Sequence, residues 1–252
     1  MTHGEDKLAQ YRQSPTEIAR TGDLLRLVPP ETGSVLDIGA RDGHFSLLFS
    51  QIPVDVTALD LIKPGFEIRG VKTVAGDVTH LEFPDRTFDL VFCAEVLEHI
   101  PALELACQEI QRVARRYILI GVPFEQDTRV SRTICQACGR RNPPYGHVNS
   151  FTEERLRALF DQCEPVERSF VGQTQEATNA MAAWLLDLGG NPWGEYSQDE
   201  GCIHCGARLV APVRQSFWKR SAAAAGIRLQ HLQTAMAPVR GNWIHMLFRK
   251  KD

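Results

Sequence analysis

The sequence has 252 residues, of which 43% are hydrophobic and 23% are charged, and its formal net charge is −3 at pH 7. This composition is ordinary for a soluble globular protein, and the small negative charge gives no general electrostatic footprint for nucleic acid. No stretch approaches the roughly 20 apolar residues that span a bilayer, and the polar N-terminus lacks a secretory signal. We therefore expect a cytoplasmic protein with neither a membrane nor a nucleic-acid partner.

The first predicted element is a helical arm within residues 1–30. Its helix is expected from Pro15 to Val28, where Pro29 and Pro30 stop it. Its leucines are expected to pack on a sheet. Because nothing in the arm identifies chemistry, we interpret it as packing.

The stretch from Val35 to Phe49 predicts a strand, a tight loop and the N-terminus of a helix, which together begin a βαβ unit that holds a nucleotide-like ligand. The dinucleotide fingerprint requires glycine at its first, third and sixth places. Here these places are taken by Gly39, Arg41 and His44. Gly43, at the fifth place, favours a loop for a ligand without a pyrophosphate, such as S-adenosylmethionine. The alternative is a turn that binds nothing.

This stretch resembles motif I of the class I S-adenosylmethionine-dependent methyltransferases, whose pattern is acid-x-Gly-x-Gly-x-Gly. Asp37, Gly39 and Gly43 match the pattern, and Arg41 stands where the middle glycine is expected. The resemblance implies that these four residues and Ala40 bind the cofactor.

A second acid of the predicted cofactor site follows the expected strand Val54–Leu59. Asp60 lies 21 residues after Gly39, and the ends of adjacent parallel strands share one rim of the sheet. The resemblance assigns Asp60 to the ribose hydroxyls, with Leu61 beside it. The alternative is a solvated acid at a strand end.

A third acid follows the expected strand Val71–Ala75. The resemblance assigns Asp77 to the adenine amino group and the backbone of Val78 to the adenine ring. The alternative is that Asp77 only forms a turn, as Asp in loops often does.

The segment from Glu95 to Ile100 is similar in sequence to the corresponding segment of small-molecule methyltransferases, such as the O-methyltransferases of the ubiquinone pathway. It follows the expected buried strand Leu90–Cys93 and precedes a helix with apolar residues at helical spacing from Leu103 to Val113. The resemblance places Glu95 at the strand end, facing the methyl donor.

The remaining strands and helices complete the fold prediction. A helix is expected over Thr152–Leu159, and the last strands are expected at Tyr117–Val122, Val166–Val171 and Trp243–Phe248. Strands that alternate with helices predict a mostly parallel sheet with helices on both faces. We therefore expect an α/β class I methyltransferase (Rossmann-like) fold, with a seven-stranded sheet in one domain over residues 1–252.

Two stretches, 123–150 and 172–241, exceed the usual length of a connection, and each contains one Cys-x-x-Cys. The four cysteines are Cys135, Cys138, Cys202 and Cys205. Their spacing is typical of a structural zinc site with four thiolate ligands. The zinc would staple the two insertions into a lid over the substrate pocket. The alternatives are four unligated thiols or two disulfides.

The first insertion also contains a candidate proton acceptor. His147 lies on the loop after the fifth strand, and an imidazole has a pKa near neutrality. The alternative is that His147 packs against Phe151 or caps the loop. The second insertion is expected to contain a helix over Ala177–Leu188 and another from Phe217, which ends or kinks at Gly226.

These features together favour an S-adenosylmethionine-dependent methyltransferase with a structural zinc ion. We expect O-methylation of a small molecule, a secondary metabolite or a sugar-like acceptor, by in-line methyl transfer. One alternative is an RNA or protein methyltransferase that uses the zinc lid for recognition. Another is a binding protein that keeps the fold without catalysis.

Overall fold

The computed structural model describes residues 10–198, 200–213 and 215–251. The chain divides into two compact units. The first, here called the sheet unit, comprises Met1–Phe124, Phe151–Gly172 and Gly241–Asp252. The second, here called the cysteine unit, comprises Glu125–Ser150 and Gln173–Arg240. The two segments of the cysteine unit coincide with the two predicted insertions to within two residues.

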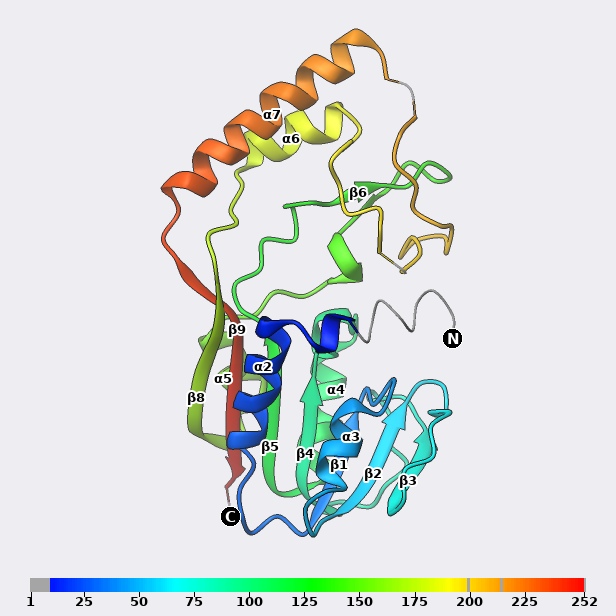
Figure 1. The fold of residues 1–252 in the computed structure, drawn as a ribbon, viewed down its shortest axis with the longest axis vertical. Helices are drawn as coiled ribbons and strands as arrows, with labels where there is room; N and C mark the ends of the chain where they lie inside the picture. The colour runs from blue at the N-terminus through cyan, green and yellow to red at the C-terminus, as the bar shows by residue number, and fades with distance from the viewer. Residues whose placement is uncertain (1–9, 199, 214, 252) are drawn as a thin grey trace. The chain divides into compact units, whose positions relative to one another are not determined.

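Seven strands form the sheet of the first unit, in the order β3-β2-β1-β4-β5-β9-β8 (Figure 1). Their bounds are Ser34–Ile38 (β1), Asp55–Asp60 (β2), Val71–Ala75 (β3), Phe88–Ala94 (β4), Ala114–Pro123 (β5), Cys163–Thr174 (β8) and Arg240–Lys250 (β9). The strands from β3 to β5 pair in parallel, whereas β9 is antiparallel to β5. The predicted mostly parallel seven-stranded sheet is confirmed.

Helices cover both faces of this sheet. They are α2 (Pro15–Arg26), α3 (His44–Phe49), α4 (Leu103–Val113) and α5 (Glu153–Leu159). Because side chains alternate along a strand, β4 contributes to two cores: Phe92 packs against Phe45 and Phe49 of α3, whereas Val91 packs in the cluster that contains Leu103. The class I methyltransferase fold is therefore confirmed.

Side-chain caps fix where two of these helices begin. The Ser14 hydroxyl accepts a hydrogen bond from the Glu17 amide at 3.2 Å, and the Thr152 hydroxyl accepts one from the Arg155 amide at 3.1 Å. Such caps satisfy amide groups that have no partner inside the helix. Helices α2 and α5 consequently begin where the sequence predicts.

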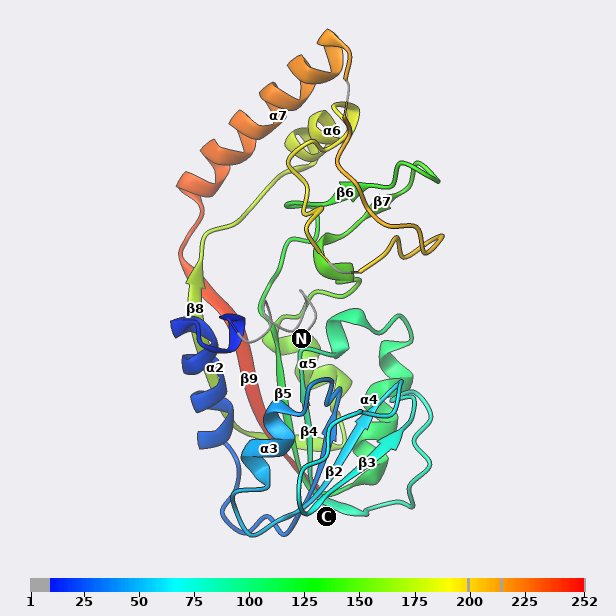
Figure 2. The same cartoon turned by 45° about the vertical axis from the view of Figure 1, so that its right-hand side comes forward.

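The cysteine unit contains a small antiparallel pair, β6 (Thr133–Ile134) and β7 (Arg141–Asn142), and two helices. The helices, α6 (Ala180–Leu188) and α7 (Phe217–Met236), lie side by side (Figures 1 and 2). In the part of the chain that the structure describes, no helix is both long enough and apolar enough to cross a bilayer.

The helix from Phe217 was predicted to end or kink at Gly226. The predicted end is wrong, because α7 continues to Met236. A Cβ atom at Gly226 would lie 2.9 Å from the Leu186 amide nitrogen and 3.0 Å from the Ala182 carbonyl oxygen of α6. This glycine therefore allows close packing of two helices, and that tertiary contact outweighs its low helix propensity.

A buried histidine joins β9 to α2 inside the sheet unit. The His245 Nδ1 donates a hydrogen bond to the Asp23 carboxylate at 2.7 Å. Burial lowers the pKa of His245 to about 4, although the Asp23 carboxylate partly opposes this shift. Burial alone would raise the pKa of Asp23, but hydrogen bonds from Ser169, His245 and Arg26 outweigh it and lower that pKa.

This histidine predicts a pH dependence of stability. Between about pH 6.5 and pH 4 the unfolded chain binds a proton at this imidazole and the folded chain does not, so the free energy of unfolding falls as the pH falls, by about 3 kcal/mol for a group with this shift. Urea denaturation across this window measures the slope. We expect His245→Gln to flatten it, because the amide still donates to Asp23 but does not titrate. The exposed His80→Gln variant is the control, and an unchanged slope in His245→Gln would contradict the assignment.

Candidate cofactor site

The loop after β1 turns directly into the N-terminus of α3. Gly39 and Gly43 have φ values of 75° and 81°, in the left-handed region that favours glycine. A Cβ atom at Gly39 would lie 2.3 Å from Val96 Cγ2, and one at Gly43 would lie 2.7 Å from the Phe66 ring. Both glycines of the predicted motif are therefore required by the backbone path and by their close neighbours.

Arg41, which replaces the middle glycine, also has a left-handed backbone, with φ 43°. Its amide donates a hydrogen bond to Asp60 Oδ2 at 2.9 Å, and the Leu61 amide donates one to Asp60 Oδ1 at 2.8 Å. Asp60 thus joins the loop after β1 to the loop after β2. The assignment of Asp60 and Leu61 to the ribose stays a prediction.

Asp37 lies under this loop and is only 2% exposed. The Ser46 hydroxyl donates a hydrogen bond to Asp37 Oδ2 at 2.6 Å. Burial raises the pKa of Asp37 to about 7, and the hydrogen bond from Ser46 only partly opposes that shift. A cation placed nearby would favour the ionised carboxylate.

Glu95 follows β4 and has a strained backbone, with φ 58°. Its amide donates to the Gly121 carbonyl at 2.9 Å, and its carboxylate accepts a hydrogen bond from Trp243 Nε1 at 2.7 Å. Contacts from β5 and β9 therefore hold this carboxylate at the end of β4.

Helix α2 places a buried guanidinium beside Glu95. Arg20 is 2% exposed and makes two hydrogen bonds to Glu17, at 2.7 and 2.8 Å. Its third nitrogen, Nη1, lies 3.6 Å from Glu95 Oε1 and has no hydrogen-bond partner among the residues that the structure describes. A buried charged donor that makes no hydrogen bond is costly. An anionic ligand group at this position would remove that cost.

These groups line one cavity of the sheet unit. Five predicted site residues line it: Asp37, Gly39, Ala40, Arg41 and Glu95. The other lining residues were not predicted: Tyr11, Arg12, Arg20, Asp42, His44, Phe45 and Ala94. The remaining predicted cofactor residues do not line this cavity: Gly43, Asp60, Leu61, Asp77 and Val78.

Asp77 lies in the turn after β3. Its Oδ1 accepts hydrogen bonds from the amide and the hydroxyl of Thr79, each at 2.8 Å, and these lower the pKa of Asp77. The following residue, Val78, is buried. Asp77 therefore forms a turn in this structure, and its assignment to adenine stays a prediction.

Arg20 was missed because the N-terminal arm was interpreted as packing. Glu17 and Arg20 share a helical phase with Leu24 and Leu27, and all four are buried. Ionisable residues in the buried phase of an amphipathic helix are candidates for a functional site. That signal was present in the sequence.

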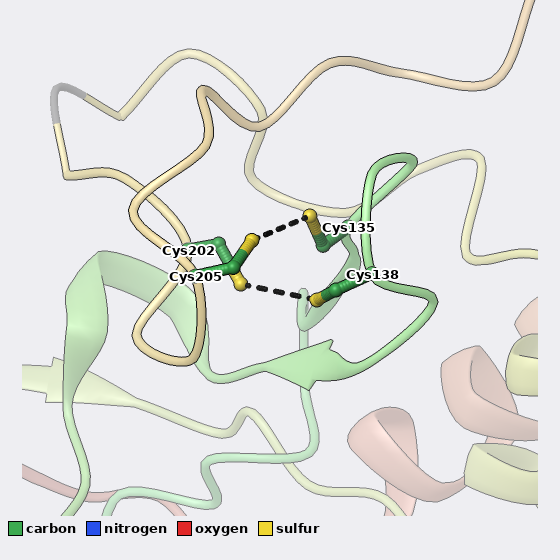
Figure 3. A group of neighbouring side chains, drawn as sticks. All are labelled: Cys135, Cys138, Cys202 and Cys205. Atoms are coloured by element: carbon green, nitrogen blue, oxygen red, sulfur yellow. Dashed lines mark hydrogen bonds between the residues drawn. The ribbon is translucent and has the colours of Figure 1, made fainter.

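The four predicted metal ligands meet in the cysteine unit (Figure 3), where all their sulfur atoms lie within 4.8 Å of one another. The sulfur atoms of Cys135 and Cys205 are 3.8 Å apart, and those of Cys138 and Cys202 are 3.6 Å apart. Zinc with tetrahedral bonds of about 2.3 Å to sulfur requires about 3.8 Å between ligands. No disulfide joins any of the four cysteines, so the alternative of two disulfides is not the arrangement in this structure.

The two cysteine loops share one backbone geometry. In each, the amide of the first cysteine donates to the carbonyl five residues later, at 2.9 Å for Cys135 and 2.8 Å for Cys202. The amides of Gly139 and Gly206 donate back to the carbonyls of these cysteines, and both glycines have a positive φ. His204 Nε2 instead contacts a backbone carbonyl at 3.1 Å. The cysteines are therefore the better ligand set.

His147 follows the short 3₁₀ helix Pro144–Gly146. Its Nδ1 lies 2.6 Å from Gln126 Oε1, and its ring lies 5.7 Å from that of Tyr145. Since an amide oxygen only accepts hydrogen bonds, Nδ1 carries the proton and Nε2 is the basic nitrogen of the neutral ring. Its role as proton acceptor stays a prediction.

Comparisons with known proteins find methyltransferases. The chain is 28% identical over 139 residues to the uncharacterized methyltransferase YcgJ of Bacillus subtilis, which covers 50% of this chain and 54% of YcgJ. The chain spans about half the length of the curated relatives that it matches.

Two solved structures with similar folds contain S-adenosylhomocysteine. One is 1,6-didemethyltoxoflavin-N1-methyltransferase of Burkholderia thailandensis, with a TM-score of 0.53, 18% identity, and coverage of 98% of this chain and 84% of that chain. The other is the N-methyltransferase NodS of Bradyrhizobium japonicum, with a TM-score of 0.53, 16% identity, and coverage of 96% and 91%. At these identities the likeness shows the fold alone.

A family model described as a methyltransferase domain matches residues 9–163. This range is more than half of the chain, and it contains the cavity-lining residues and the strands β1 to β5. The chain therefore belongs to the methyltransferase domain family, within the class I S-adenosylmethionine-dependent methyltransferases.

Proposed function

We propose that this protein transfers the methyl group of S-adenosylmethionine to an oxygen atom of a small-molecule acceptor. The observation that carries the proposal is the buried, incompletely paired guanidinium of Arg20 in a cavity that also contains Asp37 and Glu95. The Arg20 guanidinium can bind the carboxylate of an amino-acid group, and the two carboxylates of the protein can balance an ammonium and a sulfonium. S-adenosylmethionine carries all three of these groups.

The cavity residues fit this cofactor by their chemistry. Arg20 Nη1 would donate to the carboxylate of the amino-acid end, and Asp37 and Glu95 would favour its positive charges. Asp60 and Asp77 keep their proposed roles toward ribose and adenine. When bound, the cofactor supplies an electrophilic methyl group. The protein then has to orient the acceptor and exclude water.

The similarity of the segment from Glu95 to Ile100 to small-molecule methyltransferases supports a small molecule as the methyl acceptor. An acceptor hydroxyl loses a proton during methyl transfer, and His147 is our candidate to receive it. We assign no other residue to proton transfer.

We further propose that the cysteine unit holds one structural zinc ion through Cys135, Cys138, Cys202 and Cys205. The sulfur spacings close to 3.8 Å support this. Four thiolates leave no open position for a substrate, so the role of the metal is to hold two distant segments of the chain together.

Recognition of the carboxylate is tested with Arg20→Met. A hydrogen bond to a charged group is worth about 1.5–3 kcal/mol, so we expect roughly 10- to 100-fold weaker S-adenosylmethionine binding by calorimetry. Decarboxylated S-adenosylmethionine should bind wild type and Arg20→Met equally. Arg115→Met, which removes a surface partner of Asp89, is the matched control. An equal loss of affinity for both ligands would contradict this role.

Zinc binding is tested by elemental analysis of the purified protein. We expect about one zinc per chain, and a loss of that zinc in Cys138→Ser, because removing one of four thiolates breaks the site. Cys163→Ser, a substitution of a cysteine in β8, should retain the metal. A metal-free wild-type protein whose cysteine unit resists proteolysis would count against the zinc site.

A further inference from the structure

Helix α7 carries large apolar side chains that face solvent. Phe217 is 72% exposed, Trp218 79%, Leu232 59% and Met236 78%. Trp218 and Leu232 are 14 residues apart, which is close to four helical turns, so they lie on the same side of the helix. These four residues, with the cations described below, are here called the α7 face.

The opposite side of α7 packs on α6. Ala223, Gly226 and Gln230 are its buried residues, and they recur at intervals of three and four. The apolar residues of the α7 face are therefore not part of the core of the cysteine unit. Burying four such side chains elsewhere would be strongly favourable.

The α7 face is also cationic. Arg220 and Arg228 are exposed, three residues after Phe217 and four residues before Leu232 respectively. Residues at these spacings are neighbours on a helix surface. Helix α7 contains no acidic residue. The charge is not confined to the helix, because the segment of the cysteine unit from Gly201 to Arg240 contains six Lys and Arg residues and no Asp or Glu, although the whole chain has a net charge of −3. Positive charge is therefore concentrated in this part of the chain.

Helix α6 adds a second exposed apolar stripe. Its members are spaced three and four residues apart: Met181, Trp184 and Leu188. The acid of this helix, Asp187, is 7% exposed at its side chain and is paired with Arg132 and Arg141. The helix pair therefore offers aromatic and aliphatic groups with little negative charge.

We propose that the α7 face docks on the surface of an anionic lipid bilayer. Indole and phenyl rings favour the headgroup boundary, aliphatic side chains favour the acyl region, and Lys and Arg favour lipid phosphates. This helix has all three groups, over a length of about 30 Å at 1.5 Å per residue. The proposal goes beyond methyl transfer and does not depend on it.

The mixture of side chains favours lipid over other anionic partners. An RNA would pair with the cations and stack on the rings, but Leu232 and Met236 would stay in water. No membrane partner is expected from the sequence, because no segment is long and apolar enough to span a bilayer. A helix that lies in the membrane–water interface needs no spanning segment.

Vesicle sedimentation of the full-length protein tests this proposal. We expect binding to vesicles with about 30% phosphatidylglycerol in phosphatidylcholine, and at least tenfold weaker binding to pure phosphatidylcholine, because Arg220 and Arg228 each contribute about 1 kcal/mol near an anionic surface. The double substitution Phe217→Ser and Trp218→Ser should weaken binding at least tenfold by removing apolar contact. Arg220→Glu with Arg228→Glu should do the same and abolish the preference for anionic lipid.

Matched controls are Leu105→Ser, an exposed apolar residue of α4, and Lys72→Glu, an exposed cation of β3. Both should bind vesicles like wild type, and all variants should keep the wild-type circular dichroism spectrum. Absence of vesicle binding, or an equal loss in the controls, would overturn the proposal. The proposal would also be overturned if vesicles did not bind and the α7 face were instead required for self-association, for RNA binding or for binding to an acidic protein.

Discussion

The candidate site depends on one incompletely satisfied ionic interaction. Glu17 neutralises Arg20 and binds two of its nitrogens, but it leaves Nη1 without a hydrogen bond in the described part of the chain. A protein that buries a guanidinium normally pairs all of it. Arg20 lines a cavity with Glu95 and Asp37, and its Nη1 lies 3.6 Å from the Glu95 carboxylate. The missing hydrogen bond is therefore better explained by a ligand than by stability.

Around this interaction the sheet provides rigid anchoring. Asp37 and Asp60 lie near the ends of β1 and β2, and Glu95 directly follows β4, the other neighbour of β1 in the sheet. Each carboxylate accepts a hydrogen bond, from Ser46, the Arg41 amide and Trp243 respectively. Such preorganisation matters because catalysis by orientation tolerates little displacement of the reactants. The left-handed backbones of Arg41 and Glu95 are local costs of this arrangement.

Much of this architecture was predictable from sequence. The strand from Val71 to Ala75 has the predicted bounds, because a short stretch rich in β-branched residues stands between the turn residues Gly70 and Gly76. The motif from Asp37 to Gly43 and the four cysteines were found because their spacing is local. The role of Gly226 was not predictable, since it depends on α6. Arg20 was overlooked because the N-terminal arm was interpreted as packing, and its contact with Glu95 joins segments that are distant in the sequence.

The cysteine unit is built differently from the sheet unit. It has few strands, and its own small core lies beside the cysteines, so a metal would supply stability that apolar burial does not. The two cysteine loops have the same backbone geometry, although Cys135 and Cys202 are 67 residues apart in the sequence. This repetition supports the proposal that the two loops bind one metal ion together.

A crystal structure with S-adenosylhomocysteine tests the central claim most directly. We predict that the ligand occupies the cavity at the ends of β1 and β4, with its carboxylate bound to Arg20 Nη1. A ligand bound elsewhere, or an Arg20 guanidinium that pairs only with protein groups in the complex, would contradict this account.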